Sequence, residues 1–162
     1  LPILLLMRIE IRRFQKTDLC QVLELCNEVR EYHRELLSGY FTPQNDDDEG
    51  KPFLESLVND KILAWVAIKG ENIEGLLLAD TKISPHLEKP RIAHICNIGV
   101  KKSSRGKGIG KLLMDTFYKY CQDKGIQEIK LGVFNKNIKA YRFYENFGFE
   151  PQEQKMSLIV KK

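Results

Sequence analysis

The sequence has few cysteines and no long apolar run. Its four cysteines include no Cys-x-x-Cys pair, so the spacings typical of zinc sites and dithiol redox sites are absent. We expect these cysteines to be reduced and the protein to be cytoplasmic. No stretch reaches the roughly eighteen apolar residues that a membrane span requires, so we expect no membrane partner. No spacing of His, Cys and acidic residues indicates a metal site. The cysteines are Cys20, Cys26, Cys96 and Cys121.

The chain also lacks a strong excess of one charge. Its 26 basic and 22 acidic residues leave a net charge of +4, which does not predict binding to nucleic acid. A length of 162 residues, with 43% hydrophobic and 30% charged residues, is typical of one globular domain. We expect that domain to span residues 7–162. We interpret residues 1–6 either as an apolar leader before a natural start at Met7 or as added residues that are not part of the natural protein.

The apolar residues follow strand and helix periods in turn along the chain. Alternating or continuous apolar runs predict strands at residues 8–12, 62–69, 73–83, 92–100, 128–134 and 155–160. Helical spacing predicts helices at residues 17–39, 52–59, 109–125 and 137–147. This order predicts an α/β fold in which helices cover a mixed, largely antiparallel sheet.

A glycine-rich segment follows the fourth predicted strand. Residues 105–110 read Arg-Gly-Lys-Gly-Ile-Gly, and five basic residues but no acid lie between Lys101 and Lys111. Glycines let consecutive backbone N–H groups turn toward one anion, and the start of the next helix adds donors and the positive end of its dipole. The segment therefore predicts a phosphate-binding loop, with a solvated basic surface as the alternative. It fits neither the Walker pattern, because Leu112 follows Lys111, nor Gly-x-Gly-x-x-Gly, whose last glycine would be Lys111.

A second segment, about thirty residues further on, strengthens this interpretation. Residues 137–149 read Asn-Ile-Lys-Ala-Tyr-Arg-Phe-Tyr-Glu-Asn-Phe-Gly-Phe. This segment and the pattern Arg-x-x-Gly-x-Gly, filled by Arg105, Gly108 and Gly110, resemble the GNAT superfamily of acetyl-CoA-dependent N-acetyltransferases. The resemblance implies a sheet of six to seven strands flanked by about four helices. It also implies that the fourth and fifth predicted strands diverge and leave a slot for the pantetheine arm of the cofactor.

The resemblance further implies which residues bind acetyl-CoA and which act in the reaction. Tyr144 matches the family's proton donor to the leaving thiolate, and a core tyrosine on an amphipathic helix is the alternative. A backbone N–H between Asn97 and Val100, with Ile98 preferred, would polarise the thioester carbonyl. Asn137 matches an asparagine near the pantetheine and is also a good helix N-cap. The residues expected to bind the cofactor are Ile98, Val100, Arg105, Gly106, Lys107, Gly108, Ile109, Gly110, Lys111 and Asn137.

The general base is open between two interpretations. Some members of the family have a glutamate where this chain has His94, and a histidine side chain can accept a proton near neutral pH. Alternatively, His94 is a structural strand residue and a chain of waters moves the proton. The acidic run from Asp46 to Glu49 either recognises cationic amines by Coulomb attraction or is a solvated loop.

These features predict direct transfer of an acetyl group from acetyl-CoA to a primary amine. No cysteine is placed to argue for a covalent enzyme intermediate. The alternative is a non-catalytic sensor that binds acyl-CoA. A nucleic-acid-binding protein is a third hypothesis, but no nucleic-acid motif accompanies the basic segment. The sequence leaves the acceptor open between small molecules and protein amines, and we expect a homodimer.

Overall fold

The computed structural model describes residues 8–39, 55–59 and 61–160. It divides into two compact units, with the boundary between Gly132 and Val133. The first unit contains a β-sheet and two long helices, and the second contains the last helix. Within the described ranges, no helix has the length and hydrophobicity that crossing a membrane requires.

Five strands form one sheet in the first unit. They are β1 (Glu10–Arg13), β2 (Leu63–Lys69), β3 (Asn72–Ile83), β4 (Arg91–Val100) and β5 (Glu128–Leu131). They lie in chain order, and neighbouring strands are antiparallel except β4 and β5, which are parallel. A two-residue turn at Gly70 and Glu71 joins β2 to β3, and Gly70 has the positive φ that such hairpin turns require, 63°. The predicted mixed, largely antiparallel α/β architecture is confirmed.

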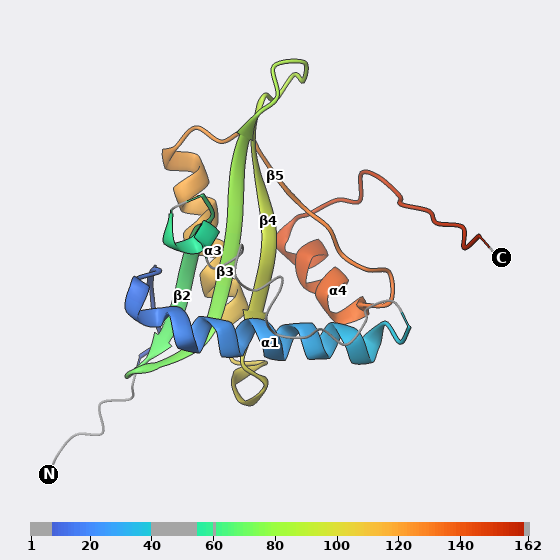
Figure 1. Cartoon of the computed structure of the whole chain (residues 1–162). Helices are drawn as coiled ribbons and strands as arrows, with labels where there is room; N and C mark the ends of the chain where they lie inside the picture. The colour runs from blue at the N-terminus through green and yellow to red at the C-terminus, as the bar shows by residue number, and fades with distance from the viewer. Residues whose placement is uncertain (1–7, 40–54, 60, 161–162) are drawn as a thin grey trace, which may run out of the picture. The chain divides into compact units, whose positions relative to one another are not determined.

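One long helix covers each face of the sheet (Figure 1). A 3₁₀ turn (Lys16–Asp18) leads into α1 (Leu19–Leu36) on one face, and α3 (Ile109–Asp123) covers the other face. On the α3 face, Trp65 packs edge-on against Phe117, with ring centroids 5.2 Å apart. The core on the α1 face includes Leu57 from a short helical turn and consists of Val22, Leu25, Cys26, Val29, Leu57, Ala64, Val66, Ile73, Leu76 and Leu78.

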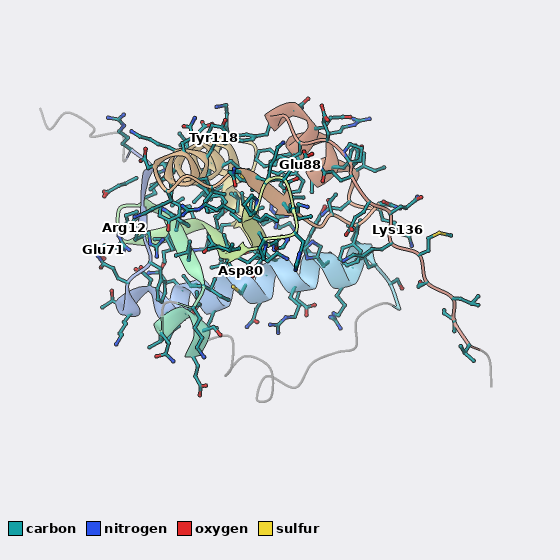
Figure 2. All side chains as sticks on the ribbon, turned by 90° about the horizontal axis from the view of Figure 1, so that it is seen from above. Arg12, Glu71, Asp80, Glu88, Tyr118 and Lys136 are labelled. Carbon is teal, nitrogen blue, oxygen red and sulfur yellow. The ribbon has the colours of Figure 1, made fainter. Side chains whose placement is uncertain are left out.

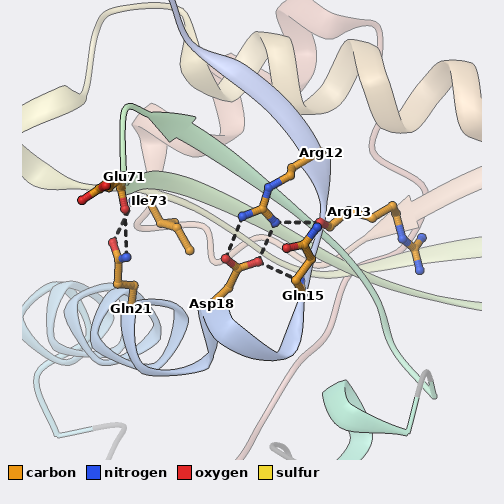
Figure 3. A network of polar contacts seen from close by, with 7 residues as sticks. All are labelled: Arg12, Arg13, Gln15, Asp18, Gln21, Glu71 and Ile73. Carbon is orange, nitrogen blue, oxygen red and sulfur yellow. Dashed lines mark hydrogen bonds and ion pairs between the residues drawn. The ribbon is translucent and has the colours of Figure 1, made fainter. Parts of the chain in front are cut away.

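The start of α1 is anchored to the sheet by polar contacts (Figure 3). The buried Asp18 carboxylate accepts hydrogen bonds from both terminal nitrogens of Arg12, at 2.7 and 2.8 Å, and from the N–H of Gln15 at 2.7 Å. The Gln21 side chain accepts from the N–H of Ile73 at 2.9 Å and donates to a carbonyl of the β2–β3 turn at 3.0 Å. Because two strands hold the first turns of α1, the helix has a defined direction across the sheet.

The pairing of β4 changes halfway along the strand. Ala79 of β3 pairs with Ile95, and Leu78 pairs with Asn97, so Cys96 is an unpaired bulge residue. Pairing with β5 also ends at Ile95. The last five residues of β4 therefore have β3 on one side and, among the described residues, no strand on the other. This confirms the expected divergence of the two strands, and β5 ends earlier than predicted because a bulged strand bends away from its neighbour.

The second unit contains α4 (Ile138–Phe147). Its N-cap is Asn137, whose side-chain oxygen accepts from the N–H of Ala140 at 3.3 Å, and Gly148 ends it with a φ of 112°. The strand predicted at residues 155–160 is wrong, since that segment has no regular structure and its apolar side chains are exposed. A strand needs a partner for its backbone groups, and no described residue pairs with this segment. The described sheet has five strands instead of the six to seven expected.

Candidate functional site

The glycine-rich loop presents a row of backbone donors. Gly106 and Gly108 have φ values of 76° and 80°, which residues with a side chain rarely adopt, and α3 begins at Ile109. The backbone N–H groups from Gly106 to Lys111 have no hydrogen-bond acceptor within the part of the chain that the structure describes. A helix start leaves such donors free, and the helix dipole favours a negative charge there. The loop can therefore bind an anion through its main chain.

Glu74 of β3 holds the first residues that follow β4. Its carbonyl accepts from the N–H of Lys101 at 2.8 Å, and its carboxylate accepts from the hydroxyl of Ser104 at 2.6 Å. Ser104 is buried, and its N–H donates to the carbonyl of Lys101 at 2.8 Å. The loop therefore leaves the sheet in a defined direction, which orders its donors before a ligand binds.

Helix α1 contacts the same loop. The Glu28 carboxylate accepts from the N–H of Lys102 at 2.6 Å and lies 3.5 Å from the Arg105 guanidinium. Arg105 also donates from Nε to the carbonyl of Val100 at 3.0 Å, and its guanidinium lies 5.1 Å from the ring centre of Tyr32. The Arg105 side chain thus joins the loop to α1. Glu28 and Tyr32 are not among the site residues predicted from the sequence, because an amphipathic helix pattern does not show which polar residues meet a distant loop.

The lysines of the loop also have partners within the protein. Lys107 donates from Nζ to the carbonyl of Ser103 at 2.8 Å, and Lys111 lies 2.6 Å from the carboxylate of Asp115, one turn along α3. These basic side chains stabilise the loop and add positive potential. Among the described residues of the loop, the main-chain N–H groups from Gly106 to Lys111 are donors without a partner in the protein.

β4 carries a free main-chain edge next to the loop. In an antiparallel pair, alternate residues exchange hydrogen bonds with the neighbouring strand. Because the N–H of Lys101 bonds to β3, the N–H and C=O groups of Ile98 and Val100 point away from β3. Of these four groups, the Val100 carbonyl accepts from Nε of Arg105. No described strand lies on that side of β4 beyond Ile95. An extended ligand with amide groups can therefore bind there as an added strand does.

His94 of β4 lies directly across from Asp80 of β3. Its Nδ1 atom is 3.6 Å from Oδ1 of Asp80, and the Sγ atom of Cys96 is 3.7 Å from Oδ2. Figure 2, seen from above, shows Asp80 on the α1 side of the sheet. Partial burial and the Asp80 carboxylate raise the pKa of the Cys96 thiol to about 11, so the thiol is neutral at pH 7. The described residues include no group of His, Cys, Asp and Glu with the arrangement of a metal site.

His94 is among the site residues predicted from the sequence, but Asp80 is not. In the sequence, Asp80 is a single carboxylate at the end of the apolar run from Leu76 to Ala79. Such a residue can equally mark the exposed end of a strand. Only the register between β3 and β4 shows that Asp80 faces His94.

Tyr144 and Asn137 belong to the second unit. The Tyr144 ring lies against the rings of Phe143 and Phe149, with centroids 5.4 and 5.8 Å away. Burial raises the pKa of Tyr144 to about 12, so its hydroxyl is protonated at neutral pH. The structure confirms Asn137 as the helix N-cap. The acidic run from Asp46 to Glu49 lies outside the described residues.

Comparison with known proteins identifies relatives of this chain. Residues 17–149 match the model of the acetyltransferase (GNAT) family. N-acetyltransferase 8B of Homo sapiens is 30% identical over 90 residues, which are 56% of this chain and 39% of that protein. The chain thus spans less than half of that relative's length. An uncharacterised N-acetyltransferase of Archaeoglobus fulgidus is 29% identical over 135 residues, 83% of this chain and 88% of that protein.

Two solved structures share the fold. A tetramutant of the BH1408 protein from Bacillus halodurans matches with a TM-score of 0.83 and 24% identity, over 93% of this chain and 99% of that chain. A predicted acetyltransferase from Clostridium acetobutylicum, solved with acetyl-CoA, matches with a TM-score of 0.71 and 19% identity, over 94% and 96% of the two chains. At these identities the similarity concerns the fold.

Proposed function

The chain belongs to the acetyltransferase (GNAT) family, and on that premise we propose that it transfers an acetyl group from acetyl-CoA to an amine. The observation that carries the proposal is the row of six backbone N–H groups from Gly106 to Lys111, which have no acceptor among the described residues. A diphosphate fits such a row at the start of a helix, since it is compact and strongly negative. The acetyl-CoA bound to the Clostridium acetobutylicum protein supports this choice of cosubstrate.

We infer that the free edge of β4 receives the pantetheine arm and the thioester. The N–H and C=O groups of Ile98 and the N–H of Val100 would pair with the pantetheine amides, as in an added strand. The N–H of Ile98 would donate to the thioester carbonyl as negative charge develops on its oxygen. The side-chain NH₂ group of Asn137, whose oxygen caps α4, is a further donor for the pantetheine arm.

The proposed reaction uses one base and one acid from the chain. His94 accepts a proton at Nε2 from the ammonium group of the acceptor, which leaves a neutral amine. The amine nitrogen attacks the thioester carbonyl carbon, the C–N bond forms and the C–S bond breaks. Tyr144 donates its hydroxyl proton to the departing thiolate, and the resulting tyrosinate accepts the second proton that the attacking nitrogen must lose to become an amide. The imidazolium of His94 then releases its proton to water. The products are an N-acetylated amine and free coenzyme A.

We propose transfer without a covalent enzyme intermediate. Cys96 lies beside His94 on β4, but its thiol has a pKa of about 11. The nucleophile in cysteine catalysis is the thiolate, which is scarce at neutral pH when the pKa is this high. The neutral amine is therefore the better nucleophile at this site.

Calorimetry with coenzyme A and a thiol-release assay with acetyl-CoA test the proposal. The amine panel contains polyamines, aminoglycosides, amino acids and lysine peptides, because the acceptor is open. We expect coenzyme A to bind and thiol release to depend on the amine, with an acetylated product in the mass spectrum. Binding without amine-dependent release would favour the acyl-CoA sensor, and no binding would contradict the loop assignment. The homodimer and the cytoplasmic location stay predictions, and light scattering after size-exclusion chromatography measures the first.

A further inference from the structure

The Asp80 carboxylate contacts two side chains of β4, His94 and Cys96. Oδ1 lies 3.6 Å from Nδ1 of His94, and Oδ2 lies 3.7 Å from Sγ of Cys96. Both residues of the Asp80–His94 pair are partly exposed, with side-chain exposures of 47% and 32%. In the described part of the chain, no Lys or Arg lies within ion-pair distance of Asp80. Among the described basic side chains, His94 is therefore the one that the Asp80 carboxylate can stabilise by direct contact.

Strand register and the β4 bulge produce this arrangement. Asp80 and His94 are directly opposite each other in the antiparallel pair, so their side chains share one face of the sheet. The bulge at Cys96 places its thiol beside the second carboxylate oxygen. On the β5 side, the residue opposite His94 is Lys130, whose Nζ lies 3.5 Å from the carboxylate of Glu128. Asp80 is thus the carboxylate that faces the His94 ring.

We propose that Asp80 is a positioning residue for His94. This inference rests on the proposed function, in which His94 accepts the proton of the acceptor amine. The carboxylate keeps the imidazole proton on Nδ1, so that Nε2 presents a free lone pair to the ammonium group. After Nε2 takes that proton, the imidazolium has a negative charge beside it, which stabilises the product of this step. A separation of 3.6 Å is longer than a hydrogen bond, and catalytic contacts often tighten when substrate binds.

Cys96 has a supporting part in this arrangement. Its thiol is within hydrogen-bonding distance of Oδ2 of Asp80 and, at 3.8 Å, of the carbonyl of His94. A donor on Oδ2 orients the carboxylate so that Oδ1 faces the imidazole. We expect Cys96→Ser to keep this orientation, because a hydroxyl is also a donor. Cys96→Ala removes this donor and should therefore weaken the orientation of the Asp80 carboxylate.

The first experiment measures the tautomer of His94 and needs no turnover. Long-range ¹H–¹⁵N NMR spectra of the labelled chain are recorded for the wild type and for Asp80→Ala, and His94→Gln identifies the His94 signals. We expect the Nδ1-protonated form in the wild type and a shift toward the Nε2-protonated form in Asp80→Ala. Asp80→Asn should be intermediate, because its amide oxygen still accepts a hydrogen bond. An unchanged His94 tautomer in Asp80→Ala overturns the proposal.

The second experiment is a double-mutant cycle on turnover. Asp80→Ala should lower kcat about tenfold, as part of the ~10²–10⁴-fold that a general base contributes, and should leave the KM for acetyl-CoA unchanged. The same substitution should have little further effect in a His94→Gln background, since Asp80 acts through His94. An equal loss in both backgrounds would show a merely structural role and would overturn the proposal. Asp123→Ala, an exposed carboxylate at the end of α3, is the matched control.

The two experiments separate this inference from the proposed function. Absence of turnover in the wild type would contradict the transferase assignment, whereas the tautomer measurement would still report on the Asp80–His94 contact. Full activity of His94→Gln would remove His94 as the base and would overturn the positioning role with it. Circular dichroism and thermal unfolding check that each variant is folded.

Discussion

Glu28 of α1 accepts a hydrogen bond from the backbone N–H of Lys102, 74 residues later in the chain, at 2.6 Å. The same carboxylate lies 3.5 Å from the Arg105 guanidinium. A helix from the start of the domain therefore supports the loop that we propose to bind the diphosphate. The polar contacts of Asp18 and Gln21 fix the direction of that helix, so the order of the loop depends on the whole α1 face of the sheet.

We expect Glu28→Ala to weaken the binding of coenzyme A by about threefold to tenfold. The loop loses a hydrogen bond to a charged acceptor, and the donors must then be ordered during binding at a cost of about 1 kcal/mol. Calorimetry measures the dissociation constant. Glu31→Ala is the control, because Glu31 is an exposed carboxylate of the same helix and pairs with Arg34. Equal affinities for the wild type and Glu28→Ala would show that the loop does not depend on α1.

Gly108→Ala should weaken coenzyme A binding through backbone strain. A Cβ atom at Gly108 meets no atom of the described residues within 4 Å, but the φ of 80° is unfavourable for alanine by about 1–2 kcal/mol. Gly39, after the end of α1, is a matched control, since it has the same φ of 80° and its Cβ position likewise meets no described atom within 4 Å. We expect similar losses of unfolding free energy in both alanine variants by urea titration. Calorimetry should show weaker binding only for Gly108→Ala, and equal affinity for both variants would argue against the loop as the phosphate site.

Tyr144→Phe should lower kcat by about 100-fold and leave the affinity for coenzyme A unchanged, because only a proton donor is removed. Since burial raises the pKa of Tyr144 to about 12, its ionisation should not reduce the wild-type rate below about pH 10. Steady-state kinetics across pH measure both effects. Tyr141→Phe, on the same helix, is the control. A Tyr144→Phe enzyme with the kcat of the wild type would exclude Tyr144 as the acid.

The Asp18 carboxylate should make stability depend on acid pH. The Arg12 hydrogen bonds lower the pKa of Asp18 from its ordinary value of 3.8. A carboxyl group with a lowered pKa contributes stability above its unfolded pKa and loses that contribution as pH falls through its folded pKa. We therefore expect Asp18→Asn to reduce the free energy of unfolding by about 1–3 kcal/mol at pH 7 and by much less at pH 2.5.

Urea unfolding at both pH values measures this difference. Asp123→Asn, an exposed carboxylate at the end of α3, serves as control and should change little. A difference of the same size at pH 7 and pH 2.5 would mean that Asp18 stabilises the fold through packing, not through its charge.

The parts of the site that lie in continuous segments could be predicted from the sequence. The loop from Arg105 to Gly110 and the helix start after it are adjacent in the chain. Their backbone donors therefore lie close together regardless of how the rest of the chain folds. The Asn137 N-cap and the end of α4 at Gly148 likewise depend on residues that are near neighbours in the chain. The predictions failed where a strand needed a partner. Residues 155–160 have a strand-like composition, but β-propensity expresses a fit to neighbouring strands and not a backbone preference alone.

By itself, the sequence determined the elements whose geometry depends on near neighbours: the glycine turn, the helix ends and the apolar faces of α1 and α3. Only the tertiary structure decided that Glu28 supports the loop and that Asp80 faces His94. Those contacts depend on strand register and on the direction of α1, which are set by packing between residues far apart in the chain. A shift of one residue in the β3–β4 register would turn Asp80 to the other face of the sheet, although the local sequence would be the same.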